Sequence, residues 1–352
     1  MKYFHISHTD LDGYTCHLIA KEIFTDGIYL NANYGLEVKL ALEFVVNKIK
    51  ELDNGSEVLF VISDLNLNYD ESKSLNKTIN ELNNNGYKIK LQLLDHHISG
   101  QKSADEFEWY FLDIKRSASK IVYDYFVENF DLDIETKQWL EPLVNAVNAV
   151  DIWLEHEEYN FEFGKVCMRL MKECGEINQF LFPDESRAYR MFLLKTAAKY
   201  IFKQNGHIAL DEEFYKIKKE YLNVTGKNDT IDNLVASKLV KMLSDKKEEL
   251  LVTYHNQKGI LTYTLGSISI VANQFLKHNE DFDFFIDISK RGIASFRAKD
   301  KLDVSLLASK LANGGGHKNA AGCKFEDFKE TIYYDNVKAF IQSKLDKIGL
   351  QV

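Results

Sequence analysis

Residues 3–13 read YFHISHTDLDG, a short apolar run that gives way to a polar cluster and ends at a glycine. A short apolar run bounded by polar residues is typical of a strand that is buried on both faces. The cluster contains His8, Asp10 and Asp12, at the point where such a strand would end. The segment therefore predicts a buried strand over residues 3–6 that presents two carboxylates and an imidazole at its carboxyl end.

The same pattern recurs twice within the first hundred residues. The apolar run 58–62 leads into Asp64, and the run 89–94 leads into the sequence DHH at 95–97. Amphipathic stretches with helical spacing lie between these runs, at residues 14–24, 36–52 and 69–82. Strands that alternate with helices predict an α/β fold with a doubly wound parallel sheet. Ligands of such sheets bind beyond the carboxyl ends of the strands, where all three polar clusters are expected.

The rest of the chain shows two further patterns. Residues 117–251 have mostly helical periodicity, and short β-rich runs follow. These runs cover residues 251–254, 260–265, 284–288 and 293–298, and a helix is predicted over 305–311. We expect a doubly wound α/β domain over 1–160, a helical connector or insertion over 161–250, and a smaller mixed α/β domain over 251–352.

Composition restricts the class of protein. With 352 residues, 45% hydrophobic residues and only 2 Pro, the chain is long enough for two globular domains and is neither disordered nor fibrous. It carries 44 Lys and Arg against 53 Asp and Glu, a net charge of −9, which argues against long duplex DNA as a partner. It contains no apolar run of membrane-spanning length and no signal-peptide pattern, so we expect a cytoplasmic protein without a membrane partner.

The four cysteines lack the paired spacing of a zinc site. A chain of this length has no need of disulfides, so we expect all four to be reduced. They are Cys16, Cys167, Cys174 and Cys323.

Each polar cluster also has an ordinary structural explanation. Asp10 or Asp12 could cap the first helix, and Asp64 could cap the helix after Tyr69. The two histidines at 96–97 could form a hydrogen-bonded turn. A cap needs only one carboxylate, however, and three strand ends that each carry an acid or an imidazole favour one shared pocket. Mixed oxygen and nitrogen ligands suit Mn²⁺ and related ions, so we expect a divalent metal site there.

Residues 313–322 read NGGGHKNAAG and form a second candidate site. Consecutive glycines let the backbone present N–H groups to an anion, and His317 and Lys318 add side-chain donors. The small residues that follow permit a tight helix start, whose dipole favours phosphate. Residues 287–324 contain eight basic residues and three acids, which fits a local phosphate clamp. A flexible glycine turn beside a solvated charged face is the alternative.

These motifs resemble those of a known family. HTDLDG at 8–13, Asp64, DHH at 95–97 and Asp151 resemble the four ordered motifs of the DHH phosphoesterases. Residues 314–322 resemble the GGGH-x-x-A-A-G signature of the C-terminal domain associated with them. The first motif is most similar to the nano-RNase branch, which contains oligoribonucleases of the NrnB type.

The resemblance implies two Mn²⁺ ions. One would be held by His8, Asp10 and Asp64, and the other by Asp12, Asp64, His96 and Asp151, with Asp64 bridging. Catalytic roles would fall to Asp64 and to His97, which would face the substrate phosphate and is the candidate acid for the leaving oxygen. The C-terminal residues implied to bind a terminal phosphate are Ser295, Arg297, Gly315, Gly316 and His317. His8 precedes Asp10 by two positions, whereas some family members have a spacing of four.

The implied activity is hydrolysis of short oligonucleotides from the 3′ end to 5′-mononucleotides by metal-activated water. The alternatives within the family are a cyclic mono- or dinucleotide phosphodiesterase and a phosphatase of 3′-phosphoadenosine 5′-phosphate. A nucleotide sensor without catalysis is a more remote alternative. The expected partner is therefore a short oligonucleotide or small nucleotide, and a dimer is the expected oligomer.

Overall fold

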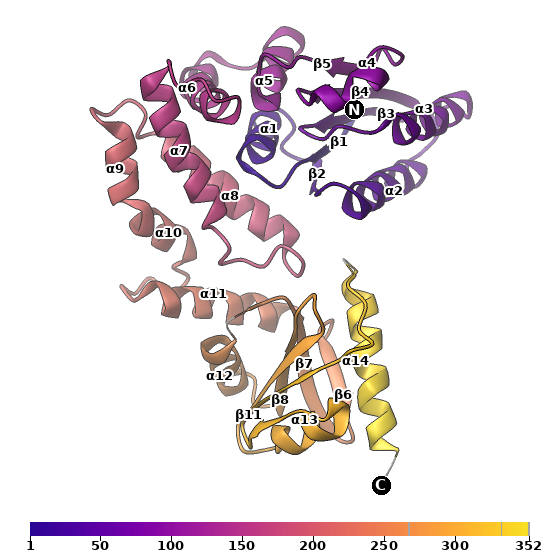
Figure 1. Cartoon of the computed structure of the whole chain (residues 1–352), viewed down its shortest axis with the longest axis vertical. Coiled ribbons are helices and arrows are strands. Elements are labelled where there is room, and N and C mark those ends of the chain that lie inside the picture. Colours follow the sequence, from indigo (N-terminus) through magenta and orange to yellow (C-terminus); the bar gives the residue numbers. More distant parts are fainter. Residues whose placement is uncertain (267, 332, 351–352) are drawn as a thin grey trace. The chain divides into compact units, whose positions relative to one another are not determined.

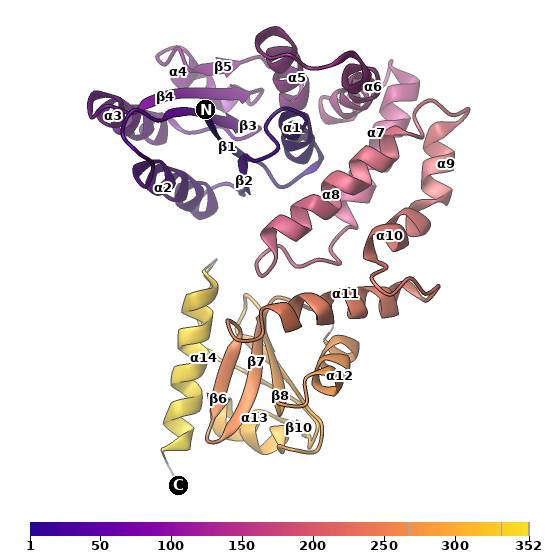
Figure 2. The same cartoon turned by 180° about the vertical axis from the view of Figure 1, so that it is seen from behind.

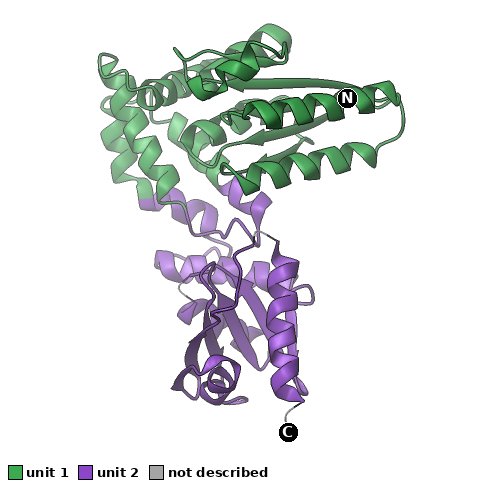
Figure 3. Cartoon of the chain, turned by 45° about the vertical axis from the view of Figure 1, so that its right-hand side comes forward, with its two compact units in different colours: residues 1–174, 190–214 green, residues 175–189, 215–352 purple. Residues whose placement is uncertain are grey.

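The computed structural model describes residues 1–266, 268–331 and 333–350. It divides into two compact units (Figure 3). Unit 1 comprises Met1–Cys174 and Arg190–Phe214, and unit 2 comprises Gly175–Tyr189 and Tyr215–Val352. The chain thus passes from one unit to the other three times, and the helices of residues 161–250 are shared between the two units.

Unit 1 is built on a parallel sheet of five strands (Figure 1). The strands are β1 (Lys2–Ser7), β2 (Ile28–Asn31), β3 (Glu57–Ser63), β4 (Lys88–Asp95) and β5 (Tyr110–Leu112). Their order is β2-β1-β3-β4-β5, and every neighbouring pair is parallel. The sheet confirms the predicted fold class. The short strands β2 and β5 were not predicted, because neither contains a continuous buried run.

Helices cover both faces of this sheet. The helices that follow the first strands are α1 (Leu11–Lys21), α2 (Leu36–Lys50), α3 (Tyr69–Asn84) and α5 (Ala118–Asn129). Side chains alternate along a strand, so Phe4 and Ile6 face one side, where they share a buried cluster with residues of α2 and α3. Tyr3 and His5 face the other side, and their rings meet Phe126 of α5 and His17 of α1. The sheet is therefore doubly wound, as predicted.

The remaining helices of the middle region follow in sequence. They are α4 (Gln101–Ala104), α6 (Ile134–Asp151), α7 (Glu158–Lys172), α8 (Pro183–Ala198), α9 (Gly206–Glu212), α10 (Phe214–Leu222) and α11 (Ile231–Asp245). Within the described part of the chain, none of the helices is both long and apolar enough to cross a bilayer. All four cysteines are buried, and none of them is in a disulfide.

Unit 2 contains a mixed sheet of six strands (Figure 2). Its strands are β6 (Leu251–Tyr254), β7 (Gln257–Tyr263), β8 (Phe284–Ile288), β9 (Ile293–Ala298), β10 (Gly315–His317) and β11 (Ala320–Lys324), in the order β10-β11-β9-β8-β7-β6. Only β7 and β8 pair in parallel. Three helices pack against these strands: α12 (Ser269–His278), α13 (Val304–Ala312) and α14 (Tyr334–Gly349). This confirms the predicted mixed α/β region.

The glycine-rich segment corrects one expectation. We expected a helix to start after the glycines, but β10 and β11 form an antiparallel hairpin there. A Cβ on Gly314 would lie 2.3 Å from the carbonyl oxygen of Gly322, and Gly316 has a φ of +146°. Close strand pairing and this backbone conformation explain the glycines, so no helix dipole acts at this position.

Candidate active site

The first site lies where the strand order of unit 1 reverses. β2 lies on one side of β1 and β3 on the other, so the crevice between the ends of β1 and β3 is the point at which such sheets bind ligands. His8 follows β1 and Asp64 follows β3. The His8 Nδ1 atom lies 3.8 Å from Asp64 Oδ2. The strand topology thus brings two of the predicted ligands together.

Asp10 both caps a helix and belongs to the cluster. Its Oδ1 accepts a hydrogen bond of 3.0 Å from the backbone N–H of Gly13, which confirms the cap of α1. Its Oδ2 lies 2.8 Å from His8 Nδ1. A Cβ on Gly13 would lie 2.4 Å from the carbonyl oxygen of His8, so only glycine lets α1 approach the loop this closely. Asp10 can therefore cap α1 with one oxygen and contribute its other oxygen to the cluster.

Asp12 is buried between two helices. It lies in the first turn of α1, but its carboxylate accepts hydrogen bonds of 2.7 and 3.0 Å from the backbone N–H groups of Ala118 and Ser119. These residues begin α5, whose positive end favours a negative charge. Burial nevertheless raises the pKa of Asp12. Asp12 therefore joins α1 to α5 and does not cap its own helix.

Asp64 is not the cap that its sequence position permits. Asn68 caps α3 and forms a reciprocal capping box with Glu71. Asp64 instead has a φ of +55°, an uncommon backbone conformation for a residue other than glycine. Its backbone N–H donates to the carbonyl oxygen of Leu94, at 3.2 Å. This conformation holds the buried carboxylate between His8 and His96.

His96 and Asp151 complete a second group. His96 Nε2 lies 3.5 Å from Asp64 Oδ1 and 3.6 Å from Asp151 Oδ2, and Asp151 is the last residue of α6. Burial lowers the pKa of His96, which favours the neutral imidazole that binds metals. The two oxygens of Asp64 thus face different groups, Oδ2 toward His8 and Oδ1 toward His96.

The donor set fits divalent cations. His8, Asp10 and Asp64 form one group, and Asp12, His96 and Asp151 form another, each with ligand atoms within 4.8 Å of one another. Oδ2 of Asp64 and Oδ2 of Asp151 are buried without a hydrogen-bond partner in the described structure. Burial and neighbouring carboxylates raise the pKa of Asp151 to about 9 and that of Asp64 well above its usual value. A bound cation would supply the missing partners.

Asp95 orients His97. Asp95 is fully buried, and its Oδ1 accepts a hydrogen bond of 2.8 Å from His97 Nδ1. Its Oδ2 accepts one of 3.3 Å from the Tyr110 hydroxyl. The hydrogen bond with Asp95 raises the pKa of His97. One carboxylate oxygen of Asp95 also lies within 4.8 Å of a ligand atom of each of Asp64, His96 and His97. The hydrogen bonds of Asp95 with His97 and Tyr110 suit a role in positioning His97.

Tyr34 also lies at the site, and it was not predicted from the sequence. Its hydroxyl lies 3.4 Å from His97 Nε2, and its ring centroid lies 5.3 Å from that of His8. It is 45% exposed. Tyr34 lies in the loop after β2, one of the strands that were not predicted, and it belongs to no sequence motif.

The predicted phosphate-binding residues lie on the hairpin side of unit 2. Arg297 of β9 is in register with Ala320, which is in register with His317, and Ser295 is linked through Gly322 to Gly315 in the same way. Residues in register lie on the same face of a sheet, so Ser295, Arg297 and His317 share one face. Arg297 also donates to the Ser269 hydroxyl at 3.0 Å. Gly316 pairs with Ala321, so it belongs to the other face of the sheet.

The positive charge around this face is partly neutralised. Four lysines of the expected basic cluster have acidic partners within 4.0 Å; the pairs are Lys290–Glu330, Lys301–Asp283, Lys318–Asp300 and Lys324–Glu326. These lysines belong to a solvated charged surface, as the alternative explanation proposed. Arg297 and His317 remain the stronger candidates for an anion contact.

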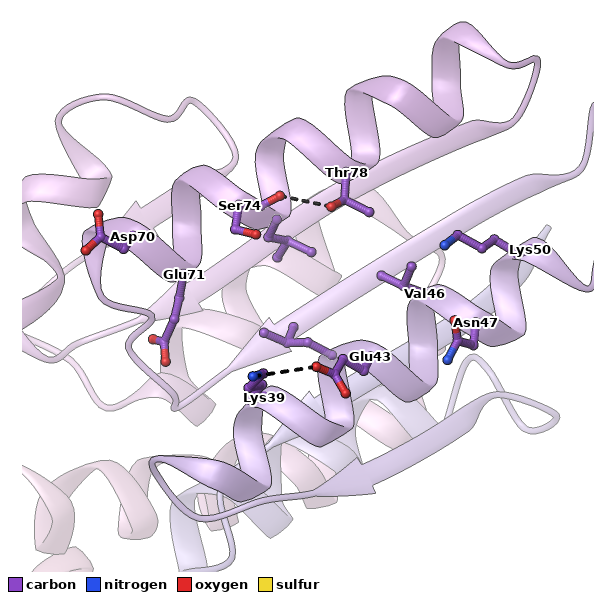
Figure 4. Close-up of a pocket in the computed structure, with 11 residues that line it drawn as sticks. Lys39, Glu43, Val46, Asn47, Lys50, Asp70, Glu71, Ser74 and Thr78 are labelled. Atoms are coloured by element: carbon purple, nitrogen blue, oxygen red, sulfur yellow. Dashed lines mark hydrogen bonds and ion pairs between the residues drawn. The ribbon is translucent and has the colours of Figure 1, made fainter.

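A separate groove lies between α2 and α3 (Figure 4). It has a volume of about 660 Å³ and an apolar floor that includes Leu42, Val46 and Leu75. Lys39 and Glu43 pair with each other on its rim, at 4.0 Å. None of the predicted site residues lines this groove, so it is distinct from the acidic cluster.

Known proteins resemble this chain over nearly its whole length. It is 43% identical over 343 residues to a 3′,5′-cyclic-nucleotide phosphodiesterase of Helicobacter pylori, which covers 97% of this chain and 98% of that protein. It is 26% identical over 330 residues to the oligoribonuclease NrnB of Bacillus subtilis, which covers 91% of this chain and 72% of NrnB. The crystal structure of an uncharacterized protein from Helicobacter pylori G27 is 42% identical, with a TM-score of 0.93 and 99% of each chain covered.

A family model also matches part of the chain. The DHHA1 domain matches residues 256–348, which include the glycine-rich hairpin of unit 2. The likeness to the cyclic-nucleotide phosphodiesterase covers 97% of the chain and so extends over both units. The chain therefore belongs to the DHH family of phosphoesterases and is a hydrolase of phosphate esters, related to NrnB.

Proposed function

We propose that the protein is a metal-dependent phosphodiesterase that hydrolyses the 3′,5′-phosphodiester bond of small nucleotides. The observation that supports this most directly is the pair of ligand groups on either side of Asp64, with two buried carboxylate oxygens that have no hydrogen-bond partner among the described residues. The mixed oxygen and nitrogen donors favour Mn²⁺. His8, Asp10 and Asp64 would hold one ion, and Asp12, Asp64, His96 and Asp151 the other.

Two cations held in this way would activate water for attack on phosphorus and neutralise the charge that develops on the phosphoryl oxygens. The chain's own residues would hold the ions, donate the proton and bind the substrate. Asp64 spans both groups, and α5 fixes the carboxylate of Asp12. His97, oriented and made more basic by Asp95, would donate a proton to the leaving oxygen. Ser295, Arg297, Gly315, Gly316 and His317 would bind a second phosphate or the sugar of the substrate.

The preferred substrate class is a 3′,5′-cyclic nucleotide. This proposal rests on the relative of 43% identity, which is named as a 3′,5′-cyclic-nucleotide phosphodiesterase. Stepwise hydrolysis of short oligonucleotides from the 3′ end, the activity expected from the sequence, is the second candidate, and the more distant likeness to NrnB favours it. Both substrates contain the same type of bond, so one metal site could serve either.

One assay tests these proposals together. The purified protein is stripped of metal and then incubated with Mn²⁺, Mg²⁺ or EDTA. The substrates are 3′,5′-cyclic AMP, the dinucleotide pApA, cyclic di-AMP and 3′-phosphoadenosine 5′-phosphate. We expect Mn²⁺-dependent release of AMP from cyclic AMP, from pApA or from both. Turnover of none of the four would contradict the proposed function, and nucleotide binding without turnover would indicate a sensor.

We further propose a cytoplasmic dimer in which residues 1–160 carry the catalytic chemistry and residues 251–352 bind substrate. Residues 161–250 contain no motif that assigns them a role. Light scattering of the purified protein and fractionation of cells would test the oligomeric state and the location.

A further inference from the structure

The helix that ends at Asp151 has an unusual C-terminus. The backbone N–H of Leu154 donates to the carbonyl oxygen of Ala149 at 2.7 Å, the bond that defines a Schellman motif. In this motif the residue before the donor takes a positive φ, and glycine is strongly preferred there. Here the residue is Trp153, with a φ of +61°. A large side chain thus occupies a backbone position at which glycine would be less strained.

Trp153 is held in place and yet exposed. Its indole N–H donates to Glu155 Oε1 at 2.9 Å, and its ring meets that of Phe161 nearly at a right angle, with centroids 5.0 Å apart. Despite these contacts, 61% of the residue is accessible to solvent. Burial in the core therefore does not account for its presence. A fixed aromatic ring with an accessible surface is suited to stacking with a flat ligand.

Trp153 is close in sequence to one of the proposed metal ligands. It follows Asp151 by two residues, which limits the distance between their Cα atoms to about 7 Å. Asp151 Oδ2 faces His96 inside the cluster. Trp153 is therefore anchored beside the proposed catalytic site, close enough for its side chain to reach the part of a substrate next to the reacting phosphate.

We propose that Trp153 stacks on the nucleobase of the substrate whose phosphate is held by the acidic cluster. This inference rests on the proposed function and extends it, because it makes an aromatic base part of what the enzyme recognises. Stacking is tolerant of base identity, since every base has a π face. We therefore expect little discrimination between adenine and guanine but a strong preference for a substrate with a base over one without.

The test compares substrates with and without a base. Whichever of cyclic AMP and pApA the wild type hydrolyses faster is paired with its base-free counterpart, in which hydrogen replaces each adenine. Trp153→Gly should lower kcat/KM for the adenine substrate about tenfold, within the range that stacking energies allow, and should leave the base-free substrate within about twofold. Trp153→Tyr, which keeps a ring, should retain most of the activity on both.

A stability measurement separates this role from a structural one. Trp153→Gly should fold normally with an unchanged or higher Tm, because glycine relieves the backbone conformation at this position. Trp139→Ala is the matched control: Trp139 lies on the same helix, twelve residues before Asp151 and about 18 Å away along the helix axis. It should not change the ratio of kcat/KM between the two substrates.

Three outcomes would overturn the inference. These are an equal loss on both substrates, no loss on either, or a change of oligomeric state with unchanged kcat/KM, which would assign Trp153 to a protein interface. If the wild type hydrolyses none of the four nucleotides of the assay above, the proposed function fails. Calorimetric affinities for AMP and ribose 5-phosphate then decide the stacking inference: Trp153→Gly must weaken the first and leave the second unchanged.

Discussion

Asp64 is buried, has a positive φ and has one oxygen without a hydrogen bond in the described structure. Each of these properties costs free energy, about 1–3 kcal/mol for a strained backbone or a missing hydrogen bond. Such costs persist where function requires them. The sequence identified Asp64 as a candidate ligand, but not its backbone conformation, since that depends on the distant carbonyl group of Leu94.

Asp64→Asn tests the bridging role while preserving the backbone. Asparagine, like aspartate, adopts a positive φ more readily than most residues other than glycine, so the loop should keep its shape. The variant removes the negative charge shared by both ligand groups. We expect kcat to fall by at least about 100-fold, since even residues that only support metal ligands are worth 10–100-fold. A variant with normal activity at saturating Mn²⁺ would exclude Asp64 as a bridge.

Asp95→Asn tests whether His97 acts as a proton donor. The hydrogen bond with Asp95 raises the pKa of His97, so removing the carboxylate should lower that pKa. A general acid works only while protonated, so the alkaline limb of the kcat profile should move to lower pH, with kcat reduced about 10–100-fold at neutral pH. If the limb does not move, His97 is not the acid.

At the scale of elements, the best-predicted parts are those with a strong local signal. β1 and β3 are continuous buried runs that end in polar residues, and β4 alternates between exposed and buried residues before its buried end. The strands β6, β8 and β9 have the predicted bounds. The strand β2 and the hairpin of β10 and β11 were not predicted, for physical reasons. β2 has only four residues, one of them buried. The hairpin consists mainly of Gly and Ala, which favour strands only when tertiary pairing requires it.

The contact of α1 with the His8 loop depends on Gly13. Gly13→Ala would place a Cβ 2.4 Å from backbone atoms that cannot move independently of the site. We expect a loss of about 1–3 kcal/mol in the free energy of unfolding, typical of overpacking, and weaker Mn²⁺ binding. Gly175→Ala is the matched control, because a Cβ there meets nothing within 4 Å. Denaturant titration and metal calorimetry measure both effects, and equal behaviour of the two variants would contradict the packing argument.

The strand β1 also carries a pH-dependent contribution to stability. His5 is buried, with Nε2 2.8 Å from the Ser63 hydroxyl, and burial lowers its pKa from 6.5 to about 3. The unfolded chain therefore binds one more proton than the folded chain between these values. Stability is fully present above pH 6.5 and falls with pH below it, by up to about 1.4 kcal/mol per pH unit.

His5→Gln keeps a polar group in the pocket but does not titrate. We expect the free energy of unfolding of the variant to depend less steeply on pH between 6 and 4 than that of the wild type. Both proteins are unfolded in urea with EDTA present, so that metal release does not contribute. Parallel pH profiles would show that His5 is not the group responsible.

At the scale of the whole molecule, metal binding should appear as thermal stabilisation. A ligand that binds only the folded state at 100 times its Kd adds about 2.7 kcal/mol. We expect Mn²⁺ to raise the Tm of the wild-type chain and EDTA to reverse the shift. Arg297→Ala, in unit 2, should show the full shift, whereas Asp64→Asn should show little. An identical shift in Asp64→Asn would place the stabilising ion elsewhere.

The chain passes between its two units after residues 174, 189 and 214. Neither unit is therefore encoded by one uninterrupted stretch of the gene. A single recombination event between relatives cannot exchange a complete unit, because three breakpoints are needed to keep each one whole. The unit with the acidic cluster and the unit with the glycine-rich hairpin therefore cannot be exchanged as uninterrupted modules.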